Sequence, residues 1–156
     1  MLKAVSTPRP LVNLFGNNIN VKEMEDAPEA YPDFTSEEPT TTLIRSPVAS
    51  GKTKTLREIL NSLAKSGANL PCFNWVSYRK TLSNETKSKV EVLQKSRLCV
   101  CHYQENEGNL AIRDWDVIIV QVESTHCLNF HGSHSHVVIL DEANGIMRQM
   151  ASGIHA

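Results

Sequence analysis

The 156-residue chain has no long apolar run and none of the cysteine or leader patterns that mark secreted proteins. No stretch approaches the ~18 consecutive apolar residues that a membrane-spanning helix needs. The N-terminal residues, Met1–Pro8, lack the apolar segment of a signal peptide. The four cysteines have no spacing typical of a disulfide framework, and we interpret them as reduced residues of the core. These absences predict an intracellular protein without a membrane segment.

Strong charge of either sign is also missing, because the net charge is −1. The charges are unevenly distributed: residues 1–40 carry three basic and seven acidic side chains, and five of the seven prolines. Such a segment buries too little apolar surface to offset its ordering entropy, so we predict a disordered, acidic, proline-rich tail there. Residues 41–156 are mildly basic, too weakly to indicate nucleic-acid binding by charge alone. At this length they are predicted to form one domain.

Apolar runs and helical patterns alternate through residues 41–156. Strands are predicted at residues 42–44, 73–77, 98–103, 116–123 and 137–140, and helices at 55–63 and 82–94. Strands alternating with helices are typical of parallel sheets built from right-handed βαβ units. The four consecutive apolar residues Val137–Leu140 further indicate a buried strand. We therefore predict a three-layer α/β domain with a mainly parallel sheet.

Glycine is scarce, with seven residues, and this scarcity affects the most informative segment, Ser46–Thr53. The segment lies between a predicted strand and a predicted helix, the context of a phosphate-binding P-loop. The pattern G-x-x-x-x-G-K-[ST] is matched at Gly51, Lys52 and Thr53, whereas Ser46 stands in place of the first glycine. We predict that backbone N–H groups and Lys52 bind phosphates, and that Thr53 offers its hydroxyl to Mg²⁺. The predicted nucleotide-binding residues are Ser46, Pro47, Val48, Ala49, Ser50, Gly51, Lys52 and Thr53.

Two carboxylates, Asp141 and Glu142, directly follow the last predicted strand. Parallel α/β folds bind ligands at the carboxyl ends of their strands, where these side chains fall. Asp141 can hold Mg²⁺ opposite Thr53, and Glu142 can act as the catalytic base that activates the attacking water. The alternative is an acidic helix cap after a core strand. In combination with Lys52 and Thr53, the two acids predict an ATP·Mg²⁺ site.

A cluster of histidines and one cysteine lies just before the last strand. Its members are His126, Cys127, His131, His134 and His136. Closely spaced cysteine and histidine can bind zinc, but the spacing matches none of the common structural zinc patterns well. The spacing therefore favours a solvated polar loop, with a zinc site as the alternative.

Four segments in fixed order carry a resemblance to a known family. They are Ser46–Thr53, Trp75–Leu82, Asp116–His126 with its Gln121-Val-Glu-Ser124 run, and Val138–Glu142. Together they resemble the N-terminal motor domain of the herpesvirus-type replication origin-binding proteins, which are superfamily-two DNA helicases. The resemblance covers residues 41–150. It implies a RecA-like P-loop NTPase domain that couples ATP hydrolysis to DNA unwinding in replication, and therefore a nuclear location.

The resemblance also implies contacts with DNA, either at the replication origin or with a single strand. Tyr78, Arg79 and Lys80 match the motif after the second strand, at the DNA-facing edge of the sheet. Arginine and lysine there can contact phosphates without reading bases. The resemblance places Glu123 near the nucleic-acid path as well. The alternatives are a solvated loop for Arg79 and Lys80, and a strand end that caps the next helix for Glu123.

The chain departs from the family pattern in its loop, where Ala49 replaces a glycine and Ser46 an alanine. Alanine strains a position that requires a positive φ. A motor of this type has two RecA-like domains, and we expect this chain to be the first, completed by a second motor domain or a partner chain. The rival interpretations are a small P-loop kinase or unrelated ATPase, and a non-catalytic, degenerate P-loop module. A kinase needs a lid with several arginines after Asp141, where only Arg148 occurs.

Overall fold

The computed structural model describes residues 2–4, 22–47, 49–79, 97–106, 108–132 and 134–153. These residues belong to two compact units, Met1–Ser62 and Leu63–Ala156, and each unit is described by itself. The helix predicted at residues 82–94 lies outside the described residues. Within the described part of the chain, no helix has the length and apolar character needed to cross a lipid bilayer.

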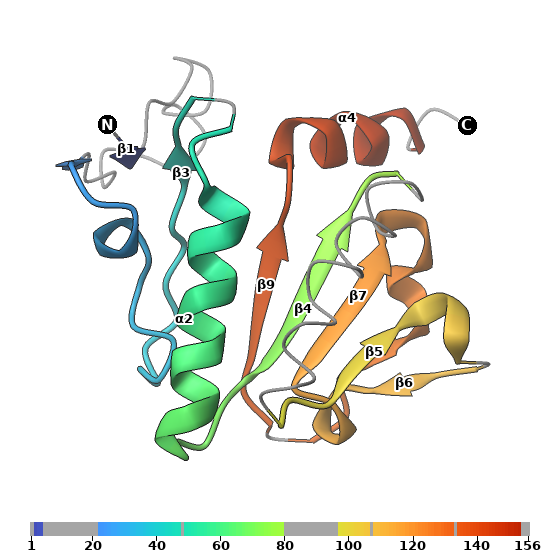
Figure 1. Ribbon diagram of the computed structural model, residues 1–156. Helices are drawn as coiled ribbons and strands as arrows, with labels where there is room; N and C mark the ends of the chain where they lie inside the picture. Colours follow the sequence, from blue (N-terminus) through green and yellow to red (C-terminus); the bar gives the residue numbers. More distant parts are fainter. Residues whose placement is uncertain are drawn as a thin grey trace. The chain divides into compact units, whose positions relative to one another are not determined.

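The unit Leu63–Ala156 is built on a sheet of four parallel strands (Figure 1). The strands are β4 (Cys72–Ser77), β5 (Val100–His102), β7 (Val117–Gln121) and β9 (His136–Leu140). Their order is β5-β7-β4-β9, and all three pairings are parallel. The prediction of an α/β fold with a mainly parallel sheet is therefore confirmed. It follows that all four carboxyl ends lie at one edge of this sheet.

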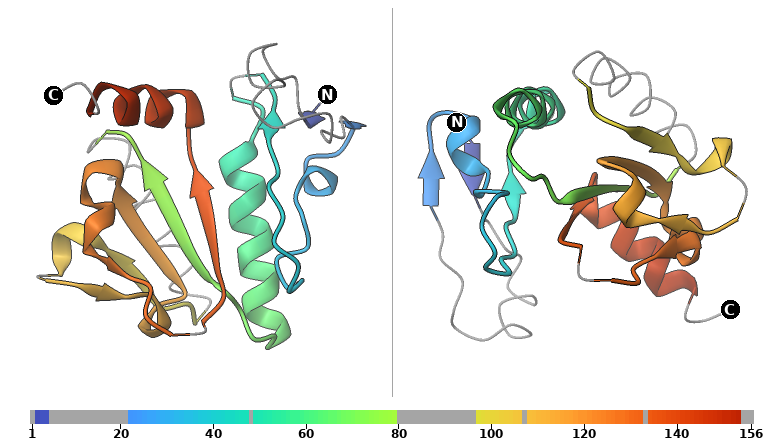
Figure 2. Two further views of the ribbon diagram at one scale, coloured as in Figure 1. Left: turned by 180° about the vertical axis from the view of Figure 1, so that it is seen from behind. Right: turned by 90° about the horizontal axis from the view of Figure 1, so that it is seen from below.

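The core of this unit lies along the two inner strands. β4 and β7 each have a neighbour on both sides, and Phe73, Trp75, Ile118 and Ile119 are almost completely buried. Helix α4 (Ala143–Gly153) follows β9 and covers one face of the sheet near the carboxyl ends of the strands (Figure 2). It is anchored there by Ile146, which is fully buried in a cluster with Val76, Val120 and Val122.

Strand β9 differs from its prediction as a buried strand. It pairs with β4 alone among the described strands, and exposed and half-buried residues alternate along it. The side chain of Val138 is 52% exposed. The apolar run at Val137–Leu140 therefore forms a parallel strand, as predicted, but an edge strand with one face open. A continuous apolar run fixes neither its neighbours nor its position in the sheet.

The described connections after β5 consist mostly of short 3-10 turns. They are η2 (Tyr103–Glu105), η3 (Ile112–Asp114) and η4 (Val122–Cys127), together with β6 (Leu110–Ala111) and β8 (Leu128–Asn129), which pair in parallel. The strand predicted at residues 116–123 ends at Gln121, because the Thr125 hydroxyl donates to the Val122 carbonyl (2.8 Å) and closes the turn.

The unit Met1–Ser62 contains a small antiparallel sheet. Its strands are β1 (Leu2–Ala4), β2 (Lys22–Met24) and β3 (Ile44–Arg45), in the order β2-β1-β3, with the 3-10 turn η1 (Pro28–Ala30). Residues 1–40, predicted as a tail, thus contribute two of these strands. The strand predicted at 42–44 appears as β3, but it pairs antiparallel with β1 and is not one of the four parallel strands. Helix α2 (Lys52–Ser66) begins at the predicted phosphate-binding residue Lys52.

Candidate functional site

The predicted phosphate-binding segment forms a tight loop between β3 and α2. Ala49 and Gly51 both have positive φ angles, 61° and 83°. The Ser50 N–H donates to the Pro47 carbonyl (3.3 Å), and the hydroxyls of Ser46 and Ser50 lie 2.6 Å apart. Ala49 therefore occupies a left-handed conformation that glycine adopts without strain. Val48 lies outside the described residues.

Lys52 reaches back over the start of this loop. Its ammonium group donates to the Ser46 hydroxyl (2.9 Å) and lies 3.3 Å from the carbonyl oxygens of Ser46 and Pro47. The Lys52 carbonyl accepts a hydrogen bond from the Tyr31 hydroxyl (2.7 Å), which ties the helix start to an earlier segment. The positive charge is thus held at the loop mouth by neutral oxygens, which an anionic phosphate can replace as a stronger partner.

The first turn of α2 presents its backbone donors toward the same loop. The first helical hydrogen bond runs from the Thr55 N–H to the Gly51 carbonyl (2.8 Å). The N–H groups of Lys52, Thr53 and Lys54 precede this bond and have no acceptor within the helix. Together with the helix dipole, such groups favour anions at a helix N-terminus. Thr53, the predicted Mg²⁺ ligand, is partly exposed in this turn.

The two predicted acids lie in the turn between β9 and α4. The Asp141 N–H donates to the Val76 carbonyl (3.2 Å), so the backbone pairing with β4 continues one residue past the strand. The Trp75 indole donates to the Asp141 carboxylate (3.3 Å) and fixes it over the carboxyl end of β4. Glu142 is exposed and has a φ of 57°. The half-buried, held Asp141 and the exposed Glu142 thus occupy different environments.

The predicted DNA contacts lie at the same edge of the parallel sheet. Tyr78 and Arg79 follow β4, and the Arg79 guanidinium lies 4.9 Å from the centre of the Tyr78 ring. The Tyr78 ring packs against Gly145 in the first turn of α4, where there is no room for a β-carbon. The Tyr78 ring therefore contacts both Arg79 and the first turn of α4, and that turn directly follows Glu142. Lys80 lies outside the described residues.

A polar network at this edge contains residues that the sequence alone does not predict as a group. The Tyr103 hydroxyl donates to the Gln121 side chain (2.8 Å), and the Gln121 amide donates to the Glu123 carboxylate (3.4 Å). Gln149 of α4 donates to the other oxygen of the same carboxylate. Glu123 is the one member predicted to be near DNA. Its partners come from η2, β7 and α4, which are brought together only by the fold.

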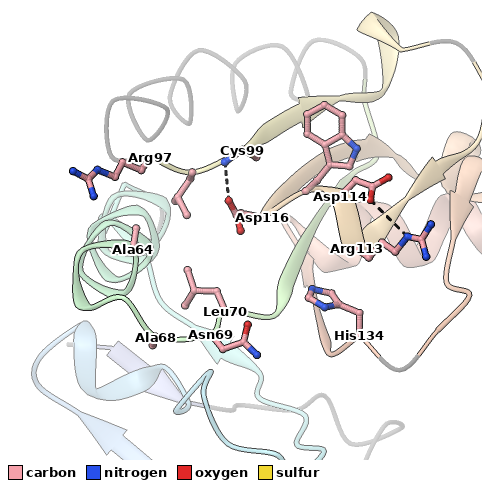
Figure 3. A pocket seen from close by; sticks show the side chains of 12 residues that line it. Ala64, Ala68, Asn69, Leu70, Arg97, Cys99, Arg113, Asp114, Asp116 and His134 are labelled. Carbon is pink, nitrogen blue, oxygen red and sulfur yellow. Dashed lines mark hydrogen bonds and ion pairs between the residues drawn. The ribbon is translucent and has the colours of Figure 1, made fainter.

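A polar cavity of about 320 Å³ lies at the opposite edge of this sheet, where the strands begin (Figure 3). Arg97, Arg113 and His134 contribute to its lining. The Asp116 carboxylate accepts a hydrogen bond from the Cys99 N–H (2.7 Å), and Arg113 pairs with Asp114 at 3.6 Å (Figure 3). The cavity therefore does not belong to the edge that carries Asp141 and Glu142.

Four of the predicted residues thus share one edge of one sheet: Asp141, Glu142 and the Tyr78–Arg79 pair. The predicted phosphate-binding residues Ser46–Thr53 belong to the other unit. Among the described residues, no group of three or more histidine, cysteine, aspartate or glutamate side chains is placed to hold a metal ion.

A sequence model described as "Origin of replication binding protein" matches residues 10–154. The chain belongs to the origin of replication binding protein family. The match covers nearly the whole chain and confirms the predicted family. Membership of the origin of replication binding protein family indicates a role in replication-origin binding, with DNA as the partner. No curated protein and no solved structure matches the chain.

Proposed function

We propose that this chain is an ATP-binding motor domain of a replication origin-binding DNA helicase. Its main support is the loop before α2, where a lysine ammonium, a left-handed turn and the first N–H groups of a helix converge. This is the arrangement that a nucleoside triphosphate requires for its phosphates. The family adds a role at replication origins, which implies action where replicating DNA is found, in the nucleus.

The acids after β9 have environments suited to two different tasks. The sequence motifs predict Thr53 and Asp141 as Mg²⁺ ligands, and hydroxyl and carboxylate oxygens are ligands of the kind that Mg²⁺ prefers. The Trp75 hydrogen bond fixes the Asp141 carboxylate, as a metal ligand requires. Glu142 is exposed to solvent, as a base that orients an attacking water must be. We assign Asp141 to the metal and Glu142 to the water.

Tyr78 and Arg79 are the proposed DNA contacts. Arg79 offers a cation for phosphates, and the Tyr78 ring, whose centre lies 4.9 Å from the guanidinium, supports that cation at the carboxyl end of β4. Neither residue reads base sequence, so origin recognition is not assigned to this pair.

Arg97, Arg113 and Arg148 are the arginines from residue 97 onward, and we do not assign any of them to the transition state. Arginine fingers raise the rate of phosphoryl transfer by about 10³–10⁵. Arg97 and Arg113 line the cavity where the strands begin, at the edge opposite Glu142, and Arg148 is an exposed residue of α4. The 156-residue chain should therefore bind ATP but hydrolyse it very slowly until a second motor domain or partner chain supplies the missing charge.

The test is a phosphate-release assay with single-stranded DNA added or omitted, beside a fluorescent strand-separation assay. We expect slow turnover, little stimulation by DNA and no unwinding. Robust DNA-stimulated turnover by the monomer would show a self-sufficient ATPase instead.

A non-catalytic P-loop module is the second candidate function, because Ala49 holds a strained left-handed backbone angle in the loop. It predicts no turnover at all, and the same residual phosphate signal for Glu142→Gln as for the unaltered chain.

A further inference from the structure

A thiol and an imidazole form a pair at the end of η4. The Cys127 Sγ lies 3.5 Å from Nε2 of His126. The other ring nitrogen, Nδ1, lies 2.9 Å from the carbonyl oxygen of Glu123. A carbonyl oxygen can only accept, so Nδ1 carries the hydrogen in the neutral ring. Nε2 is left with its lone pair facing the thiol, as a base for the thiol proton requires.

The imidazole of the pair lines an open cavity. The residues on either side of Cys127, His126 and Leu128, line a cavity of about 390 Å³. Its remaining lining combines amides, an aromatic ring and a second imidazole, from Asn109, Asn129, Phe130 and His131. Cys127 does not line the cavity itself, but it is partly exposed and lies between two residues that do.

The other three cysteines lack this combination. Cys72 and Cys101 are buried, and burial raises the pKa of the Cys72 thiol to about 12 and the pKa of the Cys101 thiol to about 11. Cys99 is exposed, but among the described contacts no imidazole pairs with its sulfur. The four thiols can therefore be compared within one chain. Cys127 has an imidazole partner, Cys99 is exposed, and Cys72 and Cys101 are buried.

We propose that Cys127 is a nucleophilic modification site that forms mixed disulfides with small disulfides such as oxidised glutathione, with His126 as its base. His126 Nε2 takes the thiol proton, and the thiolate attacks one sulfur of the ligand disulfide. A new bond forms between Sγ and that sulfur while the ligand's S–S bond breaks. The departing thiolate takes the proton from His126, so Cys127 is oxidised and the second half of the ligand is reduced.

The measurement is the rate of alkylation of each cysteine by iodoacetamide, resolved by peptide mass spectrometry, on the full chain between about pH 6 and 8.5. We expect Cys127 to react about fivefold or more faster than Cys99 at about pH 6.5. The ratio of the two rates should fall toward one as the pH rises. Oxidised glutathione should give a mixed disulfide first at Cys127. In guanidinium chloride the two rates should become equal, because the pairing is lost.

His126→Gln removes the base, and His131→Gln is the matched control, since His131 also lines the cavity and no hydrogen bond between its side chain and Cys127 is described. The first variant should lower the Cys127 rate to that of Cys99, and the second should leave it unchanged. Protection of Cys72 and Cys101 reports whether each variant is folded. If His126→Gln unfolds, the proposal is still tested by the unaltered chain, through the pH dependence of the ratio of the Cys127 alkylation rate to the Cys99 alkylation rate. Equal rates for these two cysteines at about pH 6.5 would overturn the proposal.

Discussion

Gly145 is the position where the structure makes its sharpest quantitative prediction. A β-carbon built on Gly145 lies 2.8 Å from Cδ1 and Cε1 of the Tyr78 ring and 3.1 Å from its Cγ. The ring cannot move freely, because it packs against the buried cluster that includes Val76 and Ile146. Gly145→Ala therefore forces either the Tyr78 ring or the first turn of α4 to shift.

Two opposing effects decide the sign of the change in stability. Replacing glycine by alanine inside a helix stabilises it by about 1 kcal/mol. Overpacking of a fixed contact costs about 1–3 kcal/mol. We expect Gly145→Ala to lower the free energy of unfolding by up to about 2 kcal/mol, because the clash involves ring atoms held by the core. Gly153→Ala is the matched control in the same helix, since nothing lies within 4 Å of its β-carbon, and it should be neutral or stabilising.

The assay is urea unfolding followed by circular dichroism, for the single variants and for the pair with Tyr78→Ala. Once the ring is removed, Gly145→Ala should become neutral or stabilising, so the cycle should show a strong interaction between the two positions. Equal effects of Gly145→Ala and Gly153→Ala in the unaltered background would refute the packing of Tyr78 on α4. The same result would refute the connection that we describe between Arg79 and the turn after Glu142, because that connection runs through the Tyr78 ring.

Two further predictions concern the acids and the DNA contact. Glu142→Gln should retain ATP while abolishing hydrolysis, whereas Asp141→Asn should weaken only the Mg²⁺-dependent part of binding, as measured by nucleotide titration with and without Mg²⁺. Loss of ATP by both variants to the same extent without regard to Mg²⁺ would make the two acids structural. Arg79→Ala should weaken single-stranded DNA binding similarly for all sequences and reduce its salt dependence, measured by fluorescence anisotropy; an unchanged salt slope would exclude a phosphate contact.

The sequence predicts the parallel strands well because each is a short apolar run with a turn at its end. β4, β5, β7 and β9 all fall within predicted strands, allowing for one residue at the start of β4 and of β9. The carboxyl-end position of Asp141 and Glu142 follows from the same reasoning. These features are local in sequence, so they can be read before any tertiary contact is known.

The sequence does not reveal which distant segments pair or pack together in the fold. The apolar run of β9 is equally compatible with an inner and an edge strand, and only its pairing with β4 shows which it is. The pairing of β3 with β1 likewise depends on a segment much earlier in the chain. The contact between Tyr78 and Gly145 joins positions that no spacing rule connects. Sequence reasoning proposed the site residues, whereas the contact of Tyr78 with Gly145 appears only in the fold.

The central claim is that Ser46–Thr53 binds the phosphates of ATP, and titration of a fluorescent ATP analogue in the presence of Mg²⁺ tests it most directly. Lys52→Ala removes the ammonium at the loop mouth, and Lys54→Ala is the control, because Lys54 is 70% exposed and pairs with Glu58 at 3.8 Å on the helix surface. Loss of one charge-assisted contact, about 1.5–3 kcal/mol, should weaken binding by Lys52→Ala roughly tenfold or more. Lys54→Ala should bind as the unaltered chain does. Equal dissociation constants for all three proteins would contradict the account.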